Sequence, residues 1–125
     1  MAKHLETGLL GERYAADFLL KKGYKILERN WRHKKAEIDI IAMDGDILVF
    51  VEVKTRSSDL WGEPADFVTT RKMELMTDAM GAYMDKIDHD WEVRFDIIGV
   101  ILHQNRHHEL QHFEDAFFPG LEGFG

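Results

Sequence analysis

The segment LVFVEVKTR, residues 48–56, constrains the fold more strongly than any other part of the chain. Its β-branched and aromatic residues are typical of a buried strand, yet it also carries Glu52 and Lys54. Burying a carboxylate or an ammonium group costs free energy unless the charge is paired. The segment therefore predicts a buried strand whose charged groups need a partner, a cation or a ligand.

The hydrophobic pattern predicts an α/β protein with the element order α-β-β-β-α-β-β, a mixed sheet flanked by helices. Helices are expected over residues 4–23 and 69–87. Strands are expected over residues 24–32, 36–43, 46–56, 91–102 and 109–117. We expect a single domain over residues 1–118 and a loose tail over residues 119–125.

Each predicted helix has an apolar stripe. In the first helix the stripe runs through Leu10, Tyr14 and Phe18, at the spacing of one helix face. In the second helix one face carries the apolar residues Met76, Ala79, Met80, Tyr83 and Ile87. We expect both stripes to pack on the sheet.

Composition limits the class of protein. A chain of 125 residues with 45% hydrophobic and 31% charged residues is typical of one globular domain. There is no run of 18 apolar residues and no charged-then-apolar leader, which predicts neither a membrane span nor a signal peptide. The absence of cysteine fits a reducing compartment, so we expect a cytoplasmic protein without a membrane partner.

Charge is distributed unevenly along the chain. The net charge is −7, but residues 1–35 alone carry +5 and residues 36–125 carry −12. Phosphate binding requires local positive charge and not a basic total. The basic residues of the first part are candidates for it: Lys21, Lys22, Lys25, Arg29, Arg32, Lys34 and Lys35.

The sequence Asp44-Gly45-Asp46 predicts a hairpin between the second and third strands. With a loop at residues 45–46, Asp39 lies opposite Glu52 and Glu37 lies opposite Lys54. With a loop at residues 44–45, Glu37 lies opposite Glu52 instead. Either register gathers the four charged groups on one face, because side chains alternate across a strand.

The other face of this hairpin is expected to pack in the core, through Ile38, Ile40, Ala42, Val51 and Val53. Carboxylates placed side by side repel one another unless a cation lies between them. Oxygen ligands favour a hard cation such as Mg²⁺, Mn²⁺ or Ca²⁺. The alternative interpretation is a half-solvated sheet with a Glu37–Lys54 cross-strand ion pair and no ligand.

Two helical residues bear on this choice. Glu12 shares a helix stripe with Gly8, Ala15 and Leu19, and small neighbours would let its carboxylate approach the sheet. Lys72 lies one turn before Met76 on the second helix, where its head could reach an anion. The alternatives are a peripheral glutamate and a solvated lysine.

Several linked motifs resemble the YraN-type family of small, poorly characterised bacterial proteins. These motifs are Gly11-Glu12 with Ala15, Asn30-Trp31-Arg32, Glu37-Ile38-Asp39, Val51-Glu52-Val53-Lys54-Thr55-Arg56 and Arg94-Phe95-Asp96. That family is grouped with the restriction-endonuclease-like (PD-D/ExK) superfamily and is similar to Holliday-junction resolvases. The resemblance implies an α-β-β-β-α-β core and a metal-dependent nuclease acting on structured or branched DNA.

The resemblance also assigns roles to residues. It implies Asp39, Glu52, Lys54 and Glu12 as catalytic residues, with Mg²⁺ or Mn²⁺ held by Asp39, Glu52, the Val53 carbonyl and a contribution from Glu12. Candidates for nucleic-acid contact are Arg56, Lys72, Arg32, Lys34 and Lys35. The resemblance gives no role to Glu37 or Asp96.

The partner expected from this resemblance is nucleic acid, with DNA preferred, and cutting two strands symmetrically would need a homodimer. A non-catalytic nucleic-acid-binding or protein-interaction module on the same fold is the second hypothesis. His103, His107, His108 and His112 are expected to be solvated or structural. Trp61 is a candidate for base stacking or for anchoring its own loop.

Overall fold

The computed structural model describes residues 2–57, 70–105 and 107–116, and within residues 2–7 it describes the backbone alone. Two helices and five strands make up this part of the chain, in the order that the sequence predicts. The elements are α1 (Ala2–Lys21), β1 (Lys25–His33), β2 (Ala36–Asp44), β3 (Ile47–Ser57), α2 (Thr70–Lys86), β4 (Val93–Leu102) and β5 (His108–Phe113).

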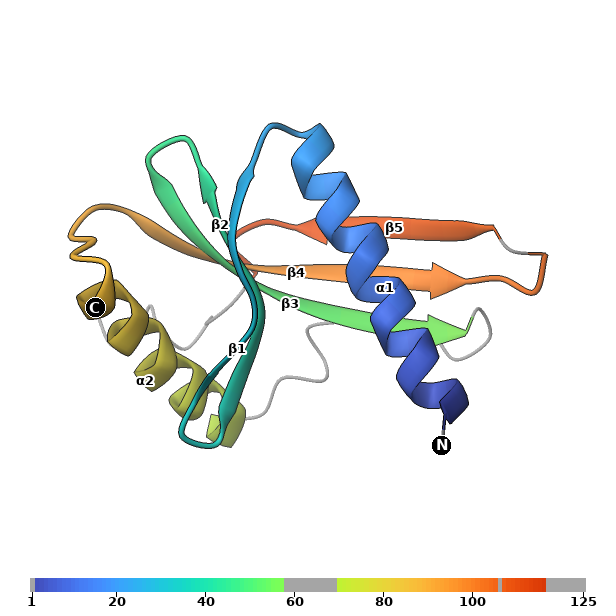
Figure 1. Ribbon diagram of the computed structural model, residues 1–125, viewed down its shortest axis with the longest axis horizontal. Helices are drawn as coiled ribbons and strands as arrows, with labels where there is room; N and C mark the ends of the chain where they lie inside the picture. Colours follow the sequence, from blue (N-terminus) through green and yellow to red (C-terminus); the bar gives the residue numbers. More distant parts are fainter. Residues whose placement is uncertain (1, 58–69, 106, 117–125) are drawn as a thin grey trace.

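The sheet has the spatial order β1-β2-β3-β4-β5 (Figure 1). Strands β3 and β4 are parallel, and every other neighbouring pair is antiparallel. A parallel pair requires a crossover connection, and the segment between β3 and β4 contains α2. The expected α/β class with an α-β-β-β-α-β core is confirmed.

The two helices cover opposite faces of the sheet. Val49 and Val51 of β3 pack in the cluster beneath α1, whereas Phe50 between them packs in the cluster beneath α2. Central strands covered on both faces are expected to be apolar at successive positions, as LVFV is. Because β3 is covered on both faces, the charged residues that follow LVFV in this strand need partners within the fold.

Helix α1 packs through its small residues. Ala15, Ala16 and Leu19 are fully buried, and a Cβ atom on Gly11 would lie 1.9 Å from Thr55 Oγ1 of β3. The stripe predicted through Leu10, Tyr14 and Phe18 is therefore wrong as the main contact. Leu10 is 37% exposed, and Tyr14 and Phe18 lie only at the margin of the cluster.

Helix α2 packs largely as predicted. Met76, Ala79, Met80 and Tyr83 are buried against β2 and β4 residues. Ile87 is the exception, because it follows the last helical residue and is 37% exposed.

The β2–β3 hairpin takes the first of the two predicted registers. Asp44 pairs with Ile47 across the two-residue loop 45–46, and Gly45 adopts φ +62°, which glycine tolerates without steric cost. The ladder runs only as far as the pair Ile40–Val51. The strands separate beyond that pair.

One prediction about this hairpin is wrong. Ile38 and Ile40 were expected on one face, but Ile40 packs beneath α1 and Ile38 packs beneath α2. The alternation along β2 is thus broken at Asp39, next to the last β2–β3 pair. Simple strand periodicity could not reveal this, because it assumes an uninterrupted ladder.

None of the described helices is long and apolar enough to cross a membrane. Trp61 and the predicted tail at residues 119–125 lie outside the described residues.

Candidate active site

Asp39 marks the point where β2 and β3 separate. Its Oδ2 accepts a 2.8 Å hydrogen bond from the backbone N–H of Val53, two residues past the last paired residue of β3. The side chain thus replaces a backbone acceptor of the missing ladder. The N–H and C=O of a strand residue point toward the same neighbouring strand, so the Val53 carbonyl faces the same opening.

Glu52 lies on the adjacent position of β3 and is only 4% exposed. Its Oε2 atom is 2.9 Å from Nζ of Lys54, and it also accepts a hydrogen bond from Lys72 Nζ of α2. Two ammonium groups therefore neutralise one buried carboxylate, which offsets the cost of removing it from water. This arrangement explains how an apolar strand accommodates two charges.

Glu12 reaches the same region from α1. Burial raises the pKa of its carboxyl group, and a hydrogen bond from Asn30 opposes that rise. The charge of Glu12 in turn raises the pKa of Asp39. The four residues predicted to be catalytic are thus brought close together from α1, β2 and β3.

The site is electrostatically unusual. The pKa of Asp39 is raised to about 7, mainly by burial and further by the neighbouring carboxylates, although the Val53 N–H lowers it. The pKa of Lys54 is lowered, because burial and the nearby Lys72 disfavour its charged form while Glu52 favours it. Perturbed groups of opposite type side by side are characteristic of functional sites.

The carboxylates of this site could hold a hard cation only together with other oxygen ligands, such as a backbone carbonyl or water. Among the described residues, no three His, Cys, Asp or Glu side chains are arranged to hold an ion by themselves. Mg²⁺ binds through one or two carboxylates and keeps several waters or substrate oxygens. Asp39, Glu52 and the Val53 carbonyl could supply oxygen ligands of that kind, and a cation would favour the charged form of the partly desolvated Asp39 carboxylate.

Glu37 has a different partner from the one predicted. It forms a cross-strand ion pair of 3.4 Å with Arg32 of β1, whereas Lys54 pairs with Glu52. Glu37 and Lys54 therefore each pair with a different residue from the one that the alternative interpretation predicted. Glu37 still contributes negative charge to the environments of Glu12 and Asp39.

The basic residues predicted to contact nucleic acid are spread around the site. Lys34 lies 3.7 Å from Asp78 of α2, and Lys35 lines a groove against the first turn of α2. Arg56 is half-buried and donates a hydrogen bond to the Thr55 carbonyl. Lys72 forms an ion pair with Glu52, so it lies beside the carboxylate cluster formed by Glu12, Asp39 and Glu52.

Asp96 belongs to a separate buried network. It is fully buried, and Arg94 binds both of its oxygens at 2.9 and 3.0 Å. His112 Nε2 lies 2.7 Å from its Oδ2, and the Asp115 N–H donates to its Oδ1. These partners lower the pKa of Asp96 despite burial, which alone would raise it. This network ties β5 to β4.

Comparison with known proteins places this fold and site in a family. The family model described as "Uncharacterised protein family UPF0102" matches residues 11–100. The chain belongs to the UPF0102 family. The matched region contains Glu12, Asp39, Glu52, Lys54 and Lys72.

Relatives extend the similarity over nearly the whole chain. A UPF0102 protein of Flavobacterium psychrophilum is 51% identical over 118 residues, covering 94% of this chain and 98% of its own. A UPF0102 protein of Flavobacterium johnsoniae is 49% identical over 123 residues, with coverage of 94% and 98%. One from Phocaeicola vulgatus is 41% identical over 121 residues, with coverage of 97% and 99%.

Sequence reasoning placed Asn30 in a motif but gave it no role in the candidate site. Asn30 opposes the rise of the Glu12 pKa and adopts φ +53° within β1. Asparagine is depleted in strands and is one of the few residues that tolerate this left-handed conformation. The presence of asparagine in a predicted strand was therefore the feature of the sequence that could have pointed to Asn30.

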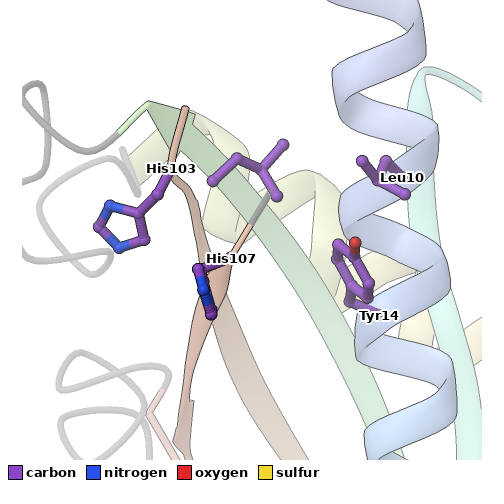
Figure 2. Close-up of a pocket in the computed structure, with 5 residues that line it drawn as sticks. Leu10, Tyr14, His103 and His107 are labelled. Carbon is purple, nitrogen blue, oxygen red and sulfur yellow. The ribbon is translucent and has the colours of Figure 1, made fainter. Parts of the chain in front are cut away.

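The histidines near the C-terminus serve separate contacts. His108 stacks on Tyr14 with ring centroids 3.7 Å apart, and His103 Nε2 lies 2.6 Å from Glu109. Figure 2 shows Leu10 and Tyr14 projecting from α1 toward the β4–β5 turn that carries His103 and His107. The stacking of His108 on Tyr14 attaches the start of β5 to α1.

Proposed function

We propose that this UPF0102 protein is a metal-dependent nuclease that hydrolyses phosphodiester bonds in structured or branched DNA, on a restriction-endonuclease-like fold. The observation that carries the proposal is the cluster of Glu12, Asp39, Glu52 and Lys54 at the opening between β2 and β3. A buried group of carboxylates beside a lysine suits binding of a hard cation and a phosphate oxygen.

Each residue has a role that its position supports. Asp39, Glu52 and the Val53 carbonyl would hold Mg²⁺ or Mn²⁺, with Glu12 completing the acidic side of the site. The cation would offset charge developing on the scissile phosphate. Lys54 would orient the attacking water and accept a proton from it. The lowered pKa of Lys54 favours the neutral amine more than in a solvated lysine.

A second candidate function is a non-catalytic nucleic-acid-binding or protein-interaction module. It is favoured by the two ion pairs of Glu52, because Lys54 and Lys72 already neutralise its charge. In such a module the site would need no cation. Metal dependence separates the two hypotheses.

The deciding experiment is cleavage of labelled four-way junction, flap, single-stranded and duplex DNA in Mg²⁺, Mn²⁺ or EDTA. Wild type, the Glu52→Ala/Lys54→Ala double variant and Asp85→Asn, an exposed carboxylate on the last turn of α2, would be compared. We expect metal-dependent cutting by wild type and Asp85→Asn and none by the double variant. Absence of cutting on all four substrates by folded wild type would favour the binding module.

Symmetric cutting of two strands would further require two sites related by a two-fold axis, and hence a homodimer. Light scattering with and without junction DNA tests that part of the proposal.

A further inference from the structure

A groove of about 290 Å³ lies between the β1–β2 turn and the first turn of α2. Lys35, Arg71 and Lys72 are among the residues that line it, together with the apolar side chains of Leu75 and Met76. Lys72 also binds Glu52. Lys72 is therefore shared between the groove and the carboxylate cluster.

The charge of the groove is positive. Glu37 is the one carboxylate among the described residues that line it, and Arg32 already pairs with it. In the part of the chain that the structure describes, no ion pair joins Lys35 or Arg71 to an acidic side chain. Lys35 and Arg71 thus face a carboxylate that is already paired, and two such cations favour an anionic ligand.

We propose that this groove holds a phosphate group of the substrate strand, adjacent to the phosphodiester bond that is cut, with Arg71 and Lys35 as its ligands. The inference rests on the proposed function and deepens it. It adds Arg71, which the sequence pattern did not single out. The guanidinium fork of arginine matches phosphate oxygens in pairs, and Leu75 and Met76 provide an apolar surface for the aliphatic stems.

The position of the groove explains why the ligand is a neighbouring phosphate and not the reacting one. Lys72 lines the groove and also contacts Glu52, whereas Glu52 is not among the described residues that line the groove. A strand that places one phosphate at the carboxylate cluster would continue past Lys72 into the groove. Contacts of this type fix the register of the strand without reading its sequence.

The test measures DNA binding separately from cleavage. Fluorescence anisotropy in EDTA gives Kd for labelled single-stranded and flap DNA over a range of salt concentrations. We expect Arg71→Ala and Lys35→Ala each to weaken binding by roughly tenfold at low salt and to reduce the salt slope of log Kd by about 1. Lys86→Ala, an exposed lysine at the opposite end of α2, should leave both unchanged.

The outcomes distinguish the two proposals. Equal Kd and salt slope for Arg71→Ala, Lys35→Ala and Lys86→Ala would overturn the groove assignment, while metal-dependent cutting by wild type would still support the nuclease. A selective loss of binding in Arg71→Ala and Lys35→Ala, in a wild type that cuts no substrate, would keep the phosphate site and remove the nuclease. A folded wild type that binds none of these DNAs would overturn both.

Discussion

The carboxylate of Asp39 accepts a hydrogen bond from the backbone N–H of Val53 at 2.8 Å, beyond the last β2–β3 backbone pair at Ile40–Val51. A side chain thereby completes the edge of β3 where the neighbouring strand turns away. The same contact holds Asp39 at the end of the ladder, where the charge of Glu52 raises the pKa of its carboxyl group. The site therefore forms at the point where β2 and β3 separate, and the Asp39–Val53 hydrogen bond belongs to both features.

Asp39→Asn should stabilise the protein above neutral pH in EDTA. The carboxyl pKa is raised from 3.8 to about 7 in the folded state. Its contribution to stability is therefore complete below pH 4 and is lost as the pH rises through 7. Asparagine keeps an oxygen acceptor for Val53 and carries no charge.

For Asp39→Asn we expect a gain of about 1–3 kcal/mol near pH 8 and no gain near pH 4. Urea unfolding at the two pH values measures it. A constant difference between wild type and variant across that range would show that Asp39 does not titrate near neutrality. Cleavage should be lost at every pH.

Binding of Mn²⁺ should release protons in the pH range where Asp39 is partly protonated. A cation favours the charged carboxylate, so about one proton per ion is expected near pH 6, and much less near pH 8.5. Calorimetry in two buffers of different ionisation enthalpy measures the number. Asp39→Asn is the matched control and should release none; equal proton release by the variant would assign the proton to another group.

Glu52→Gln should destabilise the protein even without metal or substrate. The change leaves Lys54 and Lys72 facing each other without the buried carboxylate that neutralises them. Breaking a buried pair costs about 3–5 kcal/mol, and the partial exposure of Lys72 reduces this to about 1–3 kcal/mol. Thermal unfolding of Glu52→Gln and the Glu52→Gln/Lys72→Met double variant measures it, and the double variant should recover part of the loss.

Gly11→Ala should destabilise the packing of α1 on β3. The added Cβ would lie 1.9 Å from Thr55 Oγ1 and 2.9 Å from its Cβ, so the helix must shift, at a cost of about 1–3 kcal/mol. Gly8→Ala is the control, because a Cβ there has no atom within 4 Å and alanine favours the helix. Equal unfolding midpoints for the two variants would contradict the close approach.

Arg94→Met should unfold the protein more readily without a specific effect on cleavage by the folded fraction. It leaves buried Asp96 with His112 and the Asp115 N–H but without its bidentate partner. We expect a loss of about 3 kcal/mol, measured by urea unfolding. A cleavage defect at temperatures where the variant is fully folded would instead connect Asp96 to the reaction.

The sequence predicted the element order because apolar residues repeat with the period of a strand in some segments and of a helix in others. It also predicted the hairpin and the grouping of Asp39, Glu52 and Lys54 on β2 and β3, since residues on either side of a tight turn are placed by local geometry. Glu12 was included because small residues surround it on α1. These predictions depend on neighbours in the chain.

Other features depended on packing between distant segments and were beyond local patterns. The burial of Ala15 and Leu19 in place of Leu10 follows from the close approach of α1 to Thr55. The placement of Ile38 on the α2 face follows from the end of the β2–β3 ladder. Asp96 was recognised in a motif together with its partner Arg94, yet its other partners, His112 and Asp115, come from β5 and the segment after it.

The sequence by itself therefore determined which charged residues lie on the strands of the hairpin. Only the tertiary structure decided that Lys72 of α2 would neutralise Glu52 and that Asn30 would lower the pKa of Glu12. The physical reason is that a buried charge is stabilised by whatever partner the fold brings to it, and that partner lies far away in the chain.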